Sequence, residues 1–173
     1  MMAARIEEAK LAGFTACTVR PQARVDAYRE AFEQNRHRVY TLAFWMTHNE
    51  LTAEELTVNT FCRAFALGPS PDAESVEHAL VAELRELMPL GSLTLQCDPR
   101  SQVNGWRRNT RRTGLEQAVV QLPATERMIF LLHDVERCEH ARIGRILGFS
   151  EQESLIGLHQ ARLRLRELLA ASA

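Results

Sequence analysis

Apolar residues recur at helical spacing along two stretches of the chain, and this periodicity fades between them. Over residues 25–48 they fall three, four or seven positions apart, a spacing typical of a long amphipathic helix. Similar stripes cover residues 52–67 and 72–88, and the last of them stops at Pro89. Three helices with short connections predict a small bundle over residues 24–88.

Two short motifs predict where helices begin. Thr52 and Glu55 have the spacing of a capping box, in which the threonine accepts a backbone N–H and the glutamate reaches back to the cap. Ser150 and Glu153 repeat this spacing near the C-terminus. We therefore expect capped helices to start at both places.

A helix-turn-helix is predicted in the second periodic stretch, residues 115–169. Gly148 stands where a helix C-terminus favours glycine, and Phe149 and Ser150 complete a three-residue turn. A short helix, such a turn and a longer helix form the motif whose second helix can enter the major groove of DNA.

Between the two stretches, residues 89–114 lack periodicity and contain Gly91, Pro99 and Gly105, which indicates a linker. We expect an all-α fold of two small helical domains joined by this flexible linker. Its parts are an N-terminal extension over 1–23, a bundle over 24–88, the linker over 89–114 and a helix-turn-helix domain over 115–173.

Charge is unevenly distributed, although the formal net charge is only −1. Residues 24–88 hold six arginines against eleven acidic residues, whereas residues 89–114 hold five arginines against one aspartate. Such asymmetry indicates different partners for the two parts. The basic residues of the linker serve either as a solvated surface or as contacts to phosphate or a partner: Arg107, Arg108, Arg111 and Arg112.

Membrane insertion and secretion are not expected. No apolar run approaches the roughly 20 residues needed to cross a bilayer. Glu7 and Glu8 interrupt the N-terminal segment where a signal peptide carries an apolar core. The sequence therefore predicts a cytoplasmic protein.

Metal, cofactor and enzyme chemistry are not indicated either. The four cysteines form no C-x-x-C pair. The nearest cluster of possible ligands is His133, Cys138 and His140, and the five-residue spacing of His133 and Cys138 does not place these two on one helix face. There is no glycine-rich phosphate loop, nucleophile elbow or zinc-binding His-Glu-x-x-His motif. The nearest acid–base pair is Asp134 with a neighbouring histidine, which is common on surface helices.

Two segments of the chain resemble the extracytoplasmic-function sigma factors of the sigma-70 class. Residues 28–66 resemble region two of that family in three runs: Val39–Ala43, Met46–Asn49 and Ala53–Phe65. Residues 115–169 resemble region four in four runs: Leu122–Arg127, Asp134–Glu136, Ile143–Ser150 and His159–Arg166. Since the segments cover more than half the chain in the family's order, we expect a member or a degenerate relative of that family.

The resemblance implies a subunit that docks on core RNA polymerase, brings it to promoter DNA and is restrained by an anti-sigma factor. Region two would bind the polymerase clamp and read the minus-ten element, and region four would read the minus-thirty-five element. The polymerase-binding residues would be Glu54, Glu55, Asn59 and Arg63. The DNA-binding residues would be Gln152, Leu155, Ile156, His159, Gln160 and Arg162. The linker arginines would contact phosphate or polymerase.

The chain departs from the family pattern at both nucleic-acid-binding helices. The third helix carries Glu77, Glu83 and Glu86 where the family has a basic and aromatic stretch that holds single-stranded DNA. The recognition helix begins with Glu151 and includes Glu153 where the family places a threonine, a lysine and an arginine. Acidic residues near phosphates are repelled, so weaker DNA contact is expected at both helices.

Two functions remain open at this point. One is a sigma factor that directs transcription initiation at a small set of promoters, which the paired modules favour. The other is a sigma-like adapter or decoy that binds an anti-sigma factor or polymerase without reading DNA. The acidic third helix and the altered recognition helix favour the second.

Overall fold

The structure, a computed structural model, describes residues 21–95 and 112–171. Within these ranges the chain is helical and contains no β-strand, so the all-α expectation is confirmed. The first half consists of three helices: α1 (Pro21–Thr47), α2 (Glu50–Leu67) and α3 (Ala73–Leu87). The second half consists of α4 (Arg112–Val120), α5 (Ala124–Phe130), a π-helical turn η1 (Leu131–Val135), α6 (His140–Leu147) and α7 (Glu151–Ala171).

The turn between α1 and α2 corrects one expectation from the sequence. His48 ends α1 with a left-handed backbone, at φ +53°. The side chain of Asn49 then accepts a hydrogen bond from the backbone N–H of Thr52 at 3.0 Å, and α2 begins at Glu50. The capping box expected at Thr52 is therefore wrong, because Asn49 supplies the capping oxygen three residues earlier.

The capping box before α7 is confirmed. The Ser150 hydroxyl accepts the Glu153 backbone N–H at 3.2 Å, and the Glu153 carboxylate accepts the Ser150 N–H at 2.8 Å. Just before it, Gly148 ends α6 with a left-handed backbone, at φ +79°. The expected helix-turn-helix is thus formed by α6, this turn and α7.

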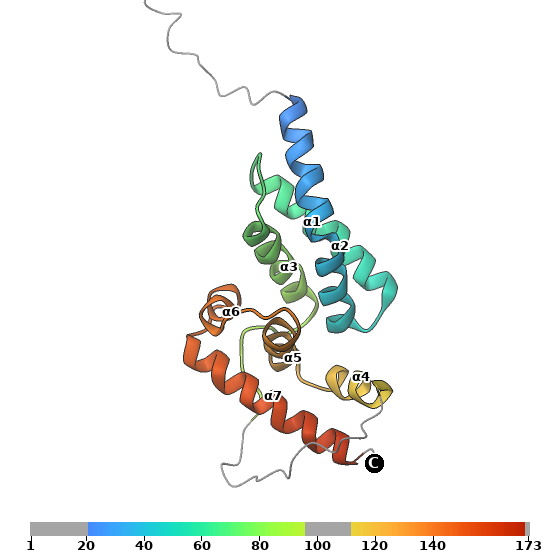
Figure 1. Ribbon diagram of the computed structural model, residues 1–173, viewed down its shortest axis with the longest axis vertical. Coiled ribbons are helices and arrows are strands. Elements are labelled where there is room, and N and C mark those ends of the chain that lie inside the picture. The colour runs from blue at the N-terminus through green and yellow to red at the C-terminus, as the bar shows by residue number, and fades with distance from the viewer. Residues whose placement is uncertain (1–20, 96–111, 172–173) are drawn as a thin grey trace, which may run out of the picture.

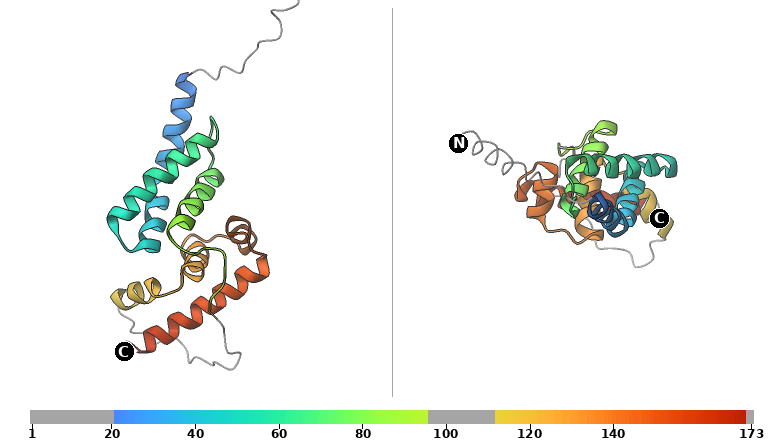
Figure 2. Two further views of the ribbon diagram at one scale, coloured as in Figure 1. Left: turned by 180° about the vertical axis from the view of Figure 1, so that it is seen from behind. Right: turned by 90° about the horizontal axis from the view of Figure 1, so that it is seen from above.

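Packing places α7 at the end of the molecule that is farthest from the first half. α2 packs along both α1 and α3, while α4, α5 and α6 each contact α7. Figures 1 and 2 show α4, α5 and α6 between α7 and the α1–α3 bundle. The outer face of α7 consequently points away from the bundle.

The two halves touch each other as well as being joined in sequence. α3 contacts α6, and α1 contacts α4 and α5. The guanidinium of Arg127, on α5, donates to the backbone oxygen of Met46 at 2.8 Å, close to the end of α1. One continuous group of buried apolar side chains extends through both halves. Of the helices described, none is long and apolar enough to span a membrane.

A tight backbone approach at Gly144 generates a stability prediction. A Cβ on Gly144 would lie 2.6 Å from the carbonyl oxygen of Phe149, in the turn between α6 and α7. Gly144→Ala should therefore lower the free energy of unfolding by roughly 2 kcal/mol, since a rigid backbone atom cannot move aside cheaply. The change is measured by urea denaturation followed by circular dichroism.

Gly114→Ala is the matched control, because the nearest atom to its new Cβ is a Leu169 side-chain carbon at 3.9 Å. In α4 this change should raise stability by roughly 0.5 to 1 kcal/mol. Equal effects of the two substitutions would contradict the steric explanation for Gly144.

Candidate functional site

The outer face of α7 is the candidate DNA-binding surface. Four of the six residues expected to read DNA are exposed along it: Gln152, Leu155, Ile156 and His159. Leu155 and Ile156 are 43% and 41% exposed, so both apolar side chains are available for contact with a partner. The structure therefore presents these four residues together on one accessible face.

The other two expected DNA-binding residues lie differently. Gln160 is half-buried, and its side-chain oxygen is enclosed without a hydrogen-bond partner among the described residues. Arg162 donates from Nη2 and Nε to the two carboxylate oxygens of Asp134, at 2.6 and 3.1 Å. Arg162 is thus engaged in a bidentate ion pair, although its side chain is still 43% exposed.

Electrostatics on α7 follow from these pairings. Burial acts to raise the pKa of Asp134, but hydrogen bonds from Arg162 and His133 outweigh it and hold that pKa below its usual value. Arg164 forms an exposed ion pair with Glu167 at 3.0 Å. Glu151 and Glu153 add negative charge at the N-terminus of α7. The face therefore presents little positive charge for phosphates to approach.

Two stacked histidines connect the helix-turn-helix to the preceding π-helical turn. The rings of His133 and His140 lie with centroids 4.5 Å apart. Nδ1 of His140 is 2.9 Å from the hydroxyl of Ser154, which is completely buried in α7. These contacts join η1, α6 and α7. No group of His, Cys, Asp and Glu side chains in residues 21–95 and 112–171 is arranged to hold a metal ion.

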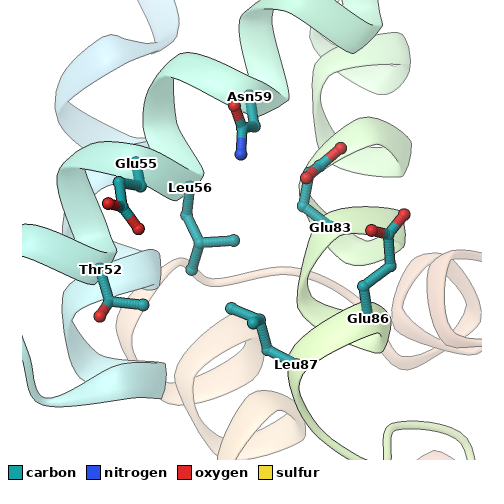
Figure 3. A pocket seen from close by; sticks show the side chains of 7 residues that line it. All are labelled: Thr52, Glu55, Leu56, Asn59, Glu83, Glu86 and Leu87. Atoms are coloured by element: carbon teal, nitrogen blue, oxygen red, sulfur yellow. The ribbon is translucent and has the colours of Figure 1, made fainter.

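A second candidate surface is an acidic groove between α2 and α3. Figure 3 shows side chains from both helices directed into it: Thr52, Glu55, Leu56, Asn59, Glu83, Glu86 and Leu87. Two of the expected polymerase-binding residues, Glu55 and Asn59, line this groove, and Glu54 is exposed on α2. We call this surface the α2–α3 groove.

Arg63, the fourth expected polymerase-binding residue, does not line the groove but pairs with two glutamates that do. Its guanidinium donates to Glu83 and to Glu86, each at 2.5 Å. These hydrogen bonds raise the pKa of Arg63. Sequence reasoning missed the contribution of α3 to this surface, because which face of α3 meets α2 depends on the packing of the bundle.

Three of the four linker arginines that were expected to contact phosphate or polymerase lie outside the part of the chain that the structure describes. Arg107, Arg108 and Arg111 lie in residues 96–111, which are not described. Arg112 is the first residue of α4.

Comparisons with known proteins agree with this architecture. Residues 112–165 match the family described as Sigma-70, region 4, and this range contains α4 to α6 and most of α7. The chain is 25% identical over 164 residues to the ECF RNA polymerase sigma factor SigE of Mycolicibacterium smegmatis, covering 86% of this chain and 64% of that protein. It thus spans slightly less than two thirds of that relative's length.

A solved structure shows the same fold. It is the co-crystal structure of the sigma factor RpoE with the anti-sigma factor NepR from Bartonella quintana, at a TM-score of 0.62 and 15% sequence identity. The match covers 84% of this chain and 98% of that one. Together the three comparisons confirm the resemblance to the extracytoplasmic-function sigma factors that the sequence predicts.

The histidine stack generates a pH prediction. Burial, and after it the nearby His133, lower the pKa of His140 below its ordinary 6.5. The unfolded chain therefore binds this proton more readily than the folded chain does. The neutral form of His140 therefore contributes to the free energy of unfolding above pH 6.5, and this contribution is lost as the pH falls below that value.

We expect the melting temperature to fall between pH 7.5 and 5.5, and to fall less in His140→Gln. His78→Gln is the matched control, because His78 is exposed on α3 and pairs only loosely with Glu74, one turn away at 3.7 Å. It should keep the wild-type slope. An unchanged slope in His140→Gln would show that this stack does not set the pH dependence.

Proposed function

We propose that the chain is a sigma factor that directs core RNA polymerase to specific promoters. The observation that carries this proposal is the joint presence of a region-four match over residues 112–165 and a preceding three-helix bundle with an accessible groove. The similarity of the chain to a sigma factor along most of its length supports it. Such a protein acts where RNA polymerase acts, in the cytoplasm, and needs no catalytic group of its own.

The α2–α3 groove suits the polymerase-docking role. Leu87 is 56% exposed and provides apolar surface. Glu55, Glu83 and Glu86 line the groove beside it and, against the single charge of Arg63, leave it net negative. A partner helix with basic and apolar residues would match this surface in both shape and sign. Glu54, Asn59 and Arg63 would extend the contact along α2.

The outer face of α7 suits promoter contact of limited strength. Gln152 and His159 carry groups that hydrogen-bond base edges, and Leu155 and Ile156 offer apolar contact for thymine methyl groups. Gln160 and Arg162 would have to leave their present positions to join them. The linker arginines, Arg107, Arg108, Arg111 and Arg112, would supply phosphate or polymerase contacts.

An anti-sigma factor is a further proposed partner. The solved relative is bound to an anti-sigma factor, and its fold covers most of this chain. A protein inhibitor could use the same exposed apolar side chains that are available here on α7 and in the α2–α3 groove.

A second candidate function, a sigma-like adapter or decoy, is favoured by one specific observation. Arg162 and Arg164 are paired with Asp134 and Glu167, and the first turn of α7 is acidic. Such a chain could bind polymerase or an anti-sigma factor without reading DNA. The two candidates differ in whether the chain binds promoter DNA.

Polymerase docking is tested with Glu55→Lys in the full chain. Reversing this charge in the groove should weaken binding to core RNA polymerase about tenfold, because a basic partner would now meet a like charge. Run-off transcription from a promoter that the wild type uses should fall with it. Glu30→Lys, an exposed charge reversal on α1, is the control and should bind like the wild type. Equal loss in both variants would reject the groove as the docking site.

DNA reading is tested by adding a cation to the face of α7. Glu151→Lys should strengthen promoter binding by the polymerase complex and steepen its salt dependence by about one to two counterions. Glu139→Lys, exposed just before α6, is the charge-matched control. If wild-type complexes form but give neither promoter binding nor transcript, and Glu151→Lys changes neither, the adapter function replaces the sigma-factor function.

A further inference from the structure

The non-helical residues that follow α3 are held by the first turn of α5. Figures 1 and 2 show residues 89–95 running from the end of α3 toward α7. The hydroxyl of Thr125, on α5, accepts the backbone N–H of Gly91 at 3.3 Å. The same hydroxyl donates to the backbone oxygen of Pro89 at 3.5 Å. We call residues 89–95 the strap.

The carboxylate of Glu126 holds the other end of the strap. Glu126 follows Thr125 on α5 and is completely buried. Its Oε1 accepts the backbone N–H groups of Thr94 and Leu95, at 2.6 and 2.7 Å. The Thr94 hydroxyl lies 3.3 and 3.4 Å from the two carboxylate oxygens. Because a buried carboxylate is costly without donors, and these described donors all belong to the strap, Glu126 and the strap stabilise each other.

Between these two anchors the strap contacts the inner face of α7. A Cβ on Gly157 would lie 2.8 Å from Cδ2 of Leu93, in the strap, and 2.6 Å from Cδ1 of Ile129, on α5. The two methyl groups therefore occupy the space that a side chain at Gly157 would need. Gly157 is buried, whereas Ile156 and His159 beside it are exposed on the outer face of α7. The strap thus supports α7 directly behind residues that are candidates for DNA contact.

The position of α7 matters for the contacts that its outer face can make. Hydrogen bonds to base edges require donor and acceptor to lie within a narrow range of distance and angle. A binding residue keeps that geometry only when the element that carries it is held by packing from behind. Leu93 and Ile129 provide such packing, and Leu93 is kept in place by the hydrogen bonds on either side of it.

We propose that Glu126 is a positioning residue for the outer face of α7. By holding the strap, Glu126 keeps Leu93 against Gly157, and this contact fixes α7 at the level of Ile156 and His159. Release of the strap would loosen this part of α7 and leave both halves folded. The consequence for DNA contact rests on the proposed function, whereas the consequence for the free chain does not.

Hydrogen exchange of the full chain, followed by NMR without polymerase or DNA, tests the inference in the free protein. Glu126→Ala should accelerate the exchange of the Thr94 and Leu95 amides and of the α7 amides around Gly157 about tenfold, because the acceptor and the support of α7 are lost. Amides of α2 in the same sample are the internal reference and should keep their wild-type rates. Glu126→Gln retains an acceptor oxygen and should keep the wild-type pattern.

Glu30→Ala is the matched control, because Glu30 is exposed on α1, and it should exchange like the wild type. The proposal is overturned by unchanged α7 amides in a folded Glu126→Ala, by Glu126→Gln behaving like Glu126→Ala, or by equal acceleration in Glu30→Ala. If Glu126→Ala accelerates the α2 amides equally and so unfolds the chain, Leu93→Ala replaces it, since Leu93 is only half-buried. Leu93→Ala must then accelerate the α7 amides selectively, and failure to do so also overturns the proposal.

Promoter binding by the polymerase complex is the functional arm of the test. At equal polymerase binding, complexes with Glu126→Ala should bind promoter DNA about tenfold more weakly than wild type, comparable to the loss of one base contact. Equal promoter affinity of the two complexes would overturn the positioning role. If the wild-type complex itself binds no promoter, the proposed function fails, and the hydrogen-exchange result still decides whether Glu126 positions α7.

Discussion

The burial of Glu77 between two arginines joins the two halves of this protein through one polar contact inside their shared interface. A carboxylate at 5% exposure needs hydrogen-bond donors or cations close to it, and one of the two arginines that meet Glu77, Arg142, comes from the opposite half. A bidentate ion pair adds a requirement for one relative orientation of the two groups that form it. The Glu77–Arg142 pair therefore adds a specific polar contact to the apolar core that both halves share, and helps to orient α6.

The acidic character of α3 has a structural explanation as well as a functional one. From the sequence, Glu77, Glu83 and Glu86 indicate only that this helix is poorly suited to hold single-stranded DNA. In the structure Glu77 pairs with Arg38 and Arg142, while Glu83 and Glu86 both pair with Arg63. These carboxylates neutralise the chain's own arginines, so α3 is both a wall of the groove and a support for α6.

The helices and the helix-turn-helix could be predicted from the sequence, because periodicity, Gly148 and the Ser150–Glu153 box are local signals. The local signal at Thr52 predicted the wrong cap. Thr52 and Glu55 have the spacing of a capping box, but α2 begins three residues earlier and Asn49 is its N-cap. The pairing of Glu77 with Arg142 could not be predicted, because these residues are 65 positions apart and meet only through packing. The contribution of α3 to the groove depends on packing in the same way.

The exposed face of α7 has side chains that could contact DNA bases but little positive charge for phosphates. The ion pairs of its arginines explain this combination. Arg162 pairs with Asp134 on the side of α7 that faces η1, and this bond helps to hold α7 in place. The same bond removes a cation from the surface that DNA would approach. Stability of the helix-turn-helix and affinity for phosphate therefore compete for one guanidinium. If the proposed function is correct, a chain that resolves this competition in favour of stability would obtain its DNA affinity elsewhere, from base contacts by Gln152 and His159 or from the polymerase that it accompanies.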